Sequence, residues 1–95
     1  MIPEAASATL RLPAVLQMAV GTDRIAVRGR TVQEALWSAF ELHPRLEQHL
    51  LLESGDLRPH VLCAVNGECL FREEIARFVL KEGDEILIQQ AISGG

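Results

Sequence analysis

The stretch His60-Val61-Leu62-Cys63-Ala64-Val65-Asn66-Gly67 decides which fold the sequence favours. Its first six residues form a nearly continuous apolar run, which is typical of a central strand covered on at least one face. Asn66-Gly67 is the strongest short turn signal in the chain, so the strand is expected to end there. A short return strand is then expected at Cys69-Leu70-Phe71. The stretch therefore predicts the centre of a β-sheet.

The residues before this stretch predict a β-hairpin and one helix. Polar and apolar residues alternate over 9–12 and again over 24–28, which favours two strands joined by a turn. Thr31 and Glu34 match a capping box, and apolar residues then recur at three- and four-residue spacing towards Pro44. The helix is expected to stop before Pro44, because the residue that precedes a proline is pushed out of helical angles.

The residues after the stretch predict a last strand at 85–89, preceded by a turn at 81–84. A hairpin followed by a helix that crosses to a central strand predicts an α+β fold of the β-grasp (ubiquitin-like) type. We expect a mixed sheet of four to five strands packed on one main helix. The predicted organisation is a flexible leader over residues 1–7, the β-grasp domain over residues 8–91, and a flexible C-terminal tail over residues 92–95 that ends in Gly-Gly.

The composition fits one small globular domain. The chain has 95 residues, of which 48% are hydrophobic and 23% charged, enough for a modest core without disulfides or metal. A net charge of −4 gives no reason to expect nucleic acid or an anionic membrane as a partner. No apolar run approaches the roughly 20 residues of a membrane span, and two cysteines without a secretory signal do not make a disulfide framework. We therefore expect a cytoplasmic protein.

The residue types that often carry catalysis or bind metals form no recognisable pattern. His60, Cys63 and Cys69 match no standard zinc spacing, and no fourth ligand is evident. The sequence has no Ser-His-Asp or Cys-His arrangement in a suitable context and no phosphate-cradling glycine loop. We expect no bound metal, no bound cofactor and no complete enzyme.

Five blocks of the sequence occur together in one order. They are the capped helix that runs into His43-Pro44, then Leu57-Arg58-Pro59-His60-Val61, Val65-Asn66-Gly67-Glu68, Leu80-Lys81-Glu82-Gly83-Asp84-Glu85-Ile86, and Ala91-Ile92-Ser93-Gly94-Gly95. Together they resemble the bacterial ubiquitin-like sulfur carriers from about Thr9 to Gly95. This family includes the small subunit of molybdopterin synthase, the thiamine-pathway carrier, and carriers that serve cysteine or metallophore synthesis. Ser93 stands where many members carry alanine, and the sequence leaves the pathway open.

The resemblance implies a chemistry at the carboxylate of Gly95. A partner enzyme similar to ubiquitin-activating enzymes would use ATP to adenylate this carboxylate. A sulfur donor, a persulfide or sulfide, would then displace AMP and leave a thiocarboxylate. Glycine at positions 94 and 95 suits the reaction, because the absent β-carbon lets the backbone enter a narrow site and leaves the carbonyl open to attack. A larger synthase subunit or another sulfur-accepting enzyme would take the sulfur.

Two other functions are compatible with the same residues. A ubiquitin-like modifier would form the same adenylate but would join Gly95 to lysines of target proteins. A non-reactive β-grasp interaction module would carry the two glycines incidentally.

The sheet surface is the second candidate site. If the odd-numbered residues of 61–65 point into the core, strand alternation points Leu62, Ala64 and, on the last strand, Leu87 outward. Phe71 is expected to join them on the return strand. We therefore predict a partner-binding surface made of Leu62, Ala64, Phe71, Leu87, Ile92 and Ser93. The alternative is that a second layer or a loop buries these side chains.

Overall fold

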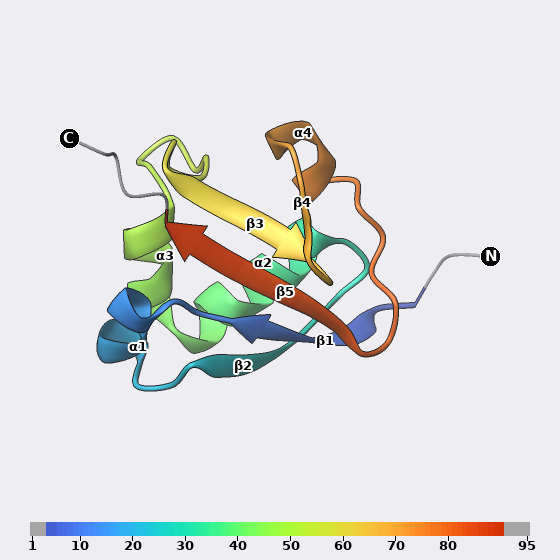
Figure 1. Cartoon of the computed structure of the whole chain (residues 1–95), viewed down its shortest axis with the longest axis horizontal. Coiled ribbons are helices and arrows are strands. Elements are labelled where there is room, and N and C mark those ends of the chain that lie inside the picture. Colours follow the sequence, from blue (N-terminus) through green and yellow to red (C-terminus); the bar gives the residue numbers. More distant parts are fainter. Residues whose placement is uncertain (1–3, 91–95) are drawn as a thin grey trace.

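The computed structural model describes residues 4–90, which contain five strands and four helices (Figure 1). In chain order these are β1 (Ala6–Arg11), α1 (Ala14–Val20), β2 (Arg24–Gly29), α2 (Val32–Leu42), α3 (Pro44–Leu50), β3 (Val61–Val65), β4 (Glu68–Cys69), α4 (Arg72–Ile75) and β5 (Asp84–Gln90).

The strands form one mixed sheet in the order β2-β1-β5-β3-β4. β1 and β5 run parallel in the middle of the sheet, and every other neighbouring pair is antiparallel. Figure 1 shows α2 crossing behind this sheet, with the opposite sheet face towards the viewer. The predicted α+β fold of the β-grasp type, with a mixed sheet packed on one main helix, is confirmed.

The main helix begins where the capping residues predicted. The Thr31 hydroxyl accepts a hydrogen bond from the Glu34 N–H at 3.3 Å, which satisfies one free amide of the first turn. The Glu34 carboxylate accepts from the N–H of Arg30 at 3.2 Å, and this bond is the largest cause of a lowered pKa at Glu34. Gly29 lets the helix start close to β2, because a β-carbon there would lie 2.5 Å from the Ala35 nitrogen.

The core lies between α2 and the sheet. Its fully buried large side chains are Leu10, Leu16, Val32, Leu36, Leu46, Leu50, Ile86 and Ile88. Val61, Cys63 and Val65 of β3 also belong to this core, as their alternation predicted. No helix within residues 4–90 is long and apolar enough to cross a membrane.

Three parts of the structure differ from the sequence prediction. Ala6 and Ser7, expected in the leader, are the first residues of β1 and pair with β2. The turn expected between the hairpin strands contains a helix, α1, which ends at Gly21 in the left-handed conformation with φ 87°. Gly21 is thus a helix C-terminal residue as well as part of a turn. The return strand β4 is shorter than predicted and ends at Cys69.

Candidate docking face and carboxyl-terminal strand

Asn66 fastens β3 to β5, the last described strand. Its side-chain amide donates to the Asp84 carboxylate at 2.9 Å, and its side-chain oxygen accepts from the N–H of Glu85 at 2.9 Å. Its own N–H donates to the carbonyl of Glu85, also at 2.9 Å. Asn66 adopts φ 50° and Gly67 φ 89°, so the turn needs residues that tolerate the left-handed region. The two sequence blocks that contain Asn-Gly and Gly-Asp-Glu therefore occur together because they bind each other.

β5 pairs with β1 over residues 84–87 and with β3 over residues 86–90. Leu87 pairs with Arg11 of β1, and Gln90 pairs with Val61 of β3, so the strand stays in register up to its last residue. The predicted reactive residues Gly94 and Gly95, and the predicted partner-binding residues Ile92 and Ser93, lie outside the described part of the chain. The fold thus fixes the position from which the last five residues continue.

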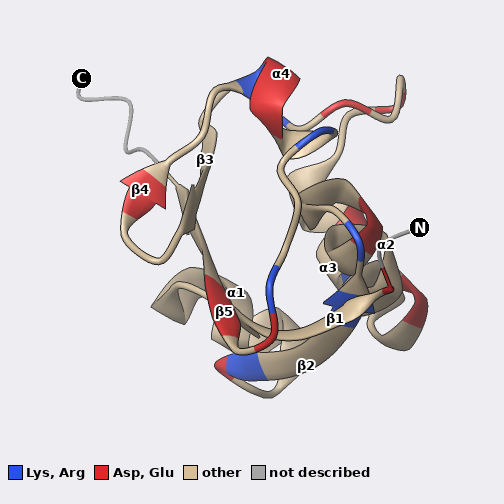
Figure 2. Ribbon diagram, turned by 90° about the vertical axis from the view of Figure 1, so that its right-hand side faces the viewer, with Lys and Arg blue, Asp and Glu red and all other residues tan. Residues whose placement is uncertain are grey.

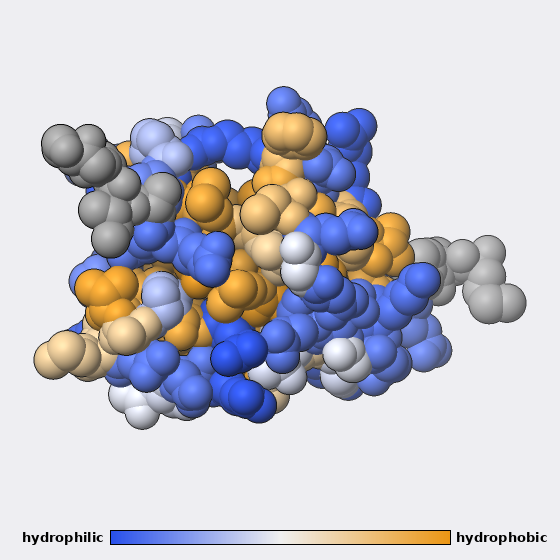
Figure 3. Space-filling view, viewed as in Figure 1, coloured by the Kyte–Doolittle hydropathy of each residue, from blue (hydrophilic) through white to orange (hydrophobic). Residues whose placement is uncertain are grey.

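The sheet face opposite α2 carries an apolar area over β3 and β5. Leu62 is 45% exposed, and Leu87 is half-buried on the neighbouring strand. Figure 3 shows this apolar area in the middle of the face, surrounded by hydrophilic residues. Within residues 4–90 no second layer or loop covers Leu62, so the alternative that its side chain is buried is wrong. We call this surface the open face.

Ala64 points towards the open face but is only 6% exposed, so its predicted exposure is wrong. It pairs directly with Leu87 on one side and with Cys69 on the other. Directly opposed residues place their side chains on the same face of a sheet, about 5 Å apart. The two larger neighbours therefore shield the alanine methyl group, and Ala64 forms the floor of the apolar area rather than its surface.

Phe71 does not lie on a return strand as predicted. It precedes the first residue of α4, where its N–H donates to the Glu74 carboxylate at 2.9 Å. Its side chain is 76% exposed. The chain turns into α4 here because the Glu74 carboxylate caps its first turn. Phe71 is thus accessible, but from α4 beside the sheet.

Charged residues lie on the β1–β2 side of the open face. Arg11 donates to the Glu85 carboxylate at 3.3 Å, and Arg28 donates to the Ser7 hydroxyl at 3.1 Å. Figure 2 shows the basic residues on β2 and the acidic residues at the start of β5. Arg11 was not predicted as a site residue, although its alternation with the apolar Leu10 along the strand already indicated this face. The open face therefore combines an apolar half with a charged half.

The two cysteines face opposite sides of the sheet. Cys63 is buried in the core, and desolvation, with a smaller effect of the nearby Cys69, raises the pKa of its thiol to about 12. Cys69 is exposed on the open face, next to Ala64. Within residues 4–90 no group of three or more His, Cys, Asp and Glu side chains is placed to hold a metal ion.

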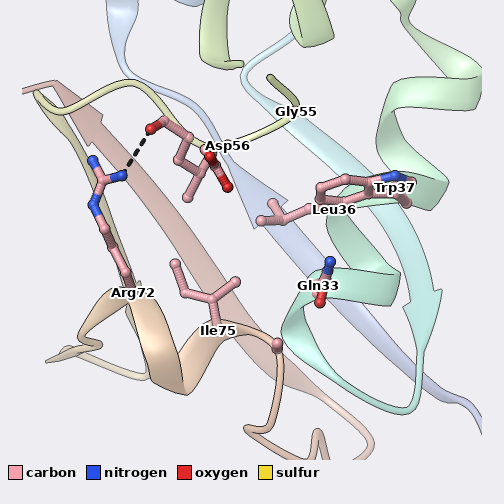
Figure 4. A pocket seen from close by; sticks show the side chains of 9 residues that line it. Gln33, Leu36, Trp37, Gly55, Asp56, Arg72 and Ile75 are labelled. Atoms are coloured by element: carbon pink, nitrogen blue, oxygen red, sulfur yellow. Dashed lines mark hydrogen bonds between the residues drawn. The ribbon is translucent and has the colours of Figure 1, made fainter. Parts of the chain in front are cut away.

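A small hollow of about 190 Å³ lies on the helix side of the molecule, between α2, the loop at 55–57 and α4 (Figure 4). Leu36, Trp37 and Ile75 form apolar walls, and Arg72 closes one side by donating to the Leu57 carbonyl at 3.0 Å. The guanidinium of Arg72 also donates to the carbonyl of Arg58, so its donors bind the protein itself. The hollow is separate from the open face and from β5.

The family model described as the ThiS family matches residues 10–95. The chain belongs to the ThiS family. The matched segment includes the open face, the Asn66 contacts with β5 and the Gly94-Gly95 pair. Membership in this family places the chain among small ubiquitin-like carrier and modifier proteins.

Solved structures agree with this assignment. Small archaeal modifier protein 1 from Methanosarcina acetivorans superposes with a TM-score of 0.82 at 29% identity, covering 98% of this chain and 100% of that chain. SAMP1 from Haloferax volcanii gives a TM-score of 0.82 at 28% identity, covering 95% and 100%. A chain of the Amycolatopsis orientalis BexX/CysO complex gives 0.78 at 26% identity, covering 93% and 99%. No curated protein matched this chain.

Proposed function

We propose that this protein is a sulfur carrier whose working group is the carboxylate of Gly95. The observation that carries the proposal is the ThiS-family match, which extends over residues 10–95 and so includes the two glycines. The fold supports it, because β5 leads towards these residues and is fixed by β1, β3 and Asn66. A carrier needs such a fixed base if its end is to enter another protein's site reproducibly.

The proposed chemistry needs two steps on Gly95. In the first, a carboxylate oxygen attacks the α-phosphorus of ATP, an acyl adenylate forms and pyrophosphate leaves. In the second, hydrosulfide attacks the acyl carbon, the bond to AMP breaks, and a thiocarboxylate, AMP and a proton result. A persulfide donor would need a thiol reductant to release the same product. The adenylating partner binds the ATP, and this chain supplies the acyl group.

The open face would contact that partner. Its apolar half contains Leu62 and Leu87, and an exposed apolar surface rimmed by polar residues is typical of protein interaction sites. The related chain from Amycolatopsis orientalis was solved in a BexX/CysO complex, so a similar protein binds another protein. The sulfur would then pass to molybdopterin-type cofactor, cysteine or metallophore biosynthesis through a larger synthase subunit or another acceptor enzyme.

Intact-mass measurement tests the proposal. The full chain is incubated with the adenylating enzyme of its own organism, ATP and sulfide. The expected product is heavier by the difference between one sulfur and one oxygen atom. A variant that lacks Gly95 should show no mass change, and a reaction without ATP is the second control. If the full chain forms no adenylate and gains no sulfur with the adenylating enzymes of its organism, the proposal fails.

Conjugation to proteins is the second candidate function, favoured by the likeness to small archaeal modifier protein 1. In that case a lysine amine of a target would attack the Gly95 adenylate, AMP would leave and an isopeptide bond would form. Immunoblots of cells that express the tagged chain should then show higher-mass forms that survive reducing agents. Their absence in a strain that does form the thiocarboxylate would assign the chain to sulfur transfer alone.

A further inference from the structure

α1 presents an apolar face that the fold does not use. The side of the helix with Leu16 and Val20 packs on the core. On the outer side, Val15 is 62% exposed and Met18 is 91% exposed, the highest value for any large hydrophobic residue within residues 4–90. Residues 14–20 include no charged side chain. An uncharged helix with two exposed apolar residues at three-residue spacing presents one continuous apolar strip.

This strip lies at the end of the sheet where β5 stops. β1 and β5 are parallel, and Arg11 at the end of β1 pairs with Leu87, so residues 88–90 extend beyond β1. α1 follows β1 after two residues and therefore occupies the same end of the sheet, as Figure 1 shows. The strip and the last residues of β5 thus lie at the same end of the molecule.

The distance from Gln90 to Gly95 limits where a partner can bind. Five residues span at most about 18 Å even when fully extended. An enzyme that reacts with the carboxylate of Gly95 must therefore approach the end of β5 within that distance. Such an enzyme is far larger than this gap, and it will cover the surface around the end of β5, where α1 lies.

We infer that Val15 and Met18 form a contact surface for the enzyme that adenylates Gly95. This inference rests on the proposed function. The complementary surface on that enzyme is apolar, because α1 offers no charge for an ion pair. Methionine suits this role, since its unbranched side chain adapts to the shape of an opposing apolar pocket. This contact lies at the end of the sheet, so it adds a second attachment point to the open face around Leu62 and Leu87.

Steady-state adenylation kinetics test the inference. Pyrophosphate release is measured with the adenylating enzyme of the same organism over a range of carrier concentrations. Met18→Glu should raise the KM for the carrier by roughly tenfold, because a carboxylate would be buried against an apolar surface. The kcat should stay unchanged, since the reacting group and β5 are intact. Met18→Gln, which carries no charge, should raise KM by less.

Val79→Glu is the matched control. Val79 is 56% exposed, so its side chain is also accessible. It pairs with Thr31, which follows the last residue of β2, whereas α1 precedes the first residue of β2. This variant should leave KM within about twofold of the wild-type value. Circular dichroism should show nearly the same melting temperature for Met18→Glu and the wild type, because the Met18 side chain is 91% exposed.

The possible results separate this inference from the proposed function. If the wild-type chain never stimulates pyrophosphate release, the proposed function fails and the inference fails with it. If the wild type is adenylated and Met18→Glu has the same KM, only the inference fails. A carrier dimer that Met18→Glu dissociates without any change in KM would assign the strip to a second copy of the chain, and would likewise overturn the inference.

Discussion

The two faces of the sheet carry different kinds of residue on the same strands. In β5, Ile86 and Ile88 are fully buried against the helix side, whereas Glu85, Leu87 and Gln89 on the open face keep solvent exposure. β3 shows the same division between the buried Cys63 and the exposed Leu62. One strand can therefore stabilise the fold with one set of side chains and offer the other set to a partner. Substitutions on the two faces should have separable effects, on stability for one face and on activation for the other.

The cysteines give the largest expected contrast between the faces. Burial raises the pKa of the Cys63 thiol from 9.0 to about 12, which lowers its thiolate fraction near pH 8 by about a thousandfold. Iodoacetamide at pH 8 should therefore modify Cys69 and leave Cys63 unmodified in the native protein. Peptide mass mapping checks this, with urea-unfolded protein as the control in which both thiols react. Equal labelling of both residues in the native state would contradict the assignment of the two faces.

The same pKa predicts how stability depends on pH. The folded chain holds the Cys63 proton to a higher pH than the unfolded chain does. Below pH 9 the thiol is neutral in both states, so its ionisation does not change the free energy of unfolding there. Stability should fall between about pH 9 and 12, by at most about 1.4 kcal/mol per pH unit from this group. Urea unfolding of the wild type and of Cys63→Ala at pH 7.5 and 10.5 should show a smaller fall for the variant.

Truncation of neighbouring side chains in β5 should separate the faces in stability. Ile88→Ala removes a fully buried side chain and should lower the free energy of unfolding by about 3 kcal/mol. Leu87→Ala, one residue earlier, removes a half-buried side chain on the open face and should cost about 1 kcal/mol or less. Urea unfolding measures both values. A larger loss for Leu87→Ala than for Ile88→Ala would show that the open face is covered.

Asn66 should contribute to stability through its contacts with β5. Asn66→Ala removes the hydrogen bonds to the Asp84 carboxylate and to the Glu85 N–H. It also places alanine at φ 50°, a left-handed conformation that alanine disfavours. We therefore expect the free energy of unfolding to fall by about 2 kcal/mol. Asn66→Gly removes the same side-chain bonds without the backbone strain, and should cost less. If both variants lose nothing in urea unfolding, the Asn66 side chain does not fasten β3 to β5.

On the open face, charge should weaken activation without unfolding the domain. Leu62→Asp places a carboxylate at the apolar half of the face and should lower the kcat/KM for adenylation by roughly tenfold. The melting temperature should change little, because Leu62 is 45% exposed. Val79→Asp is the control for a general effect of charge, because Val79 is 56% exposed and lies far from the apolar half of the face. Unchanged kinetics for Leu62→Asp would remove Leu62 from the docking surface.

The sequence predicted best those features that depend on neighbouring residues. The Thr31 cap, the helix that follows it and the alternation of β3 are local patterns, and the structure confirms them. The exposure of Ala64 depends instead on which side chains lie across the sheet, Leu87 and Cys69, and no local pattern contains that information. α1 was missed because Gly21 marks a turn and a helix end equally well, and seven residues are too few for a clear helical period.

The ion pair between Arg11 and Glu85 should give the smallest effect. Both side chains are more than 40% exposed, and the N–O distance is 3.3 Å, so water and salt screen the attraction. Arg11→Ala and Glu85→Ala should each lower the free energy of unfolding by no more than about 0.5 kcal/mol. A double-mutant cycle in low and high salt measures the coupling between them. If that coupling is near zero while either variant changes the KM for adenylation, these charges act in recognition, and the charged half of the open face belongs to the docking surface together with the apolar half.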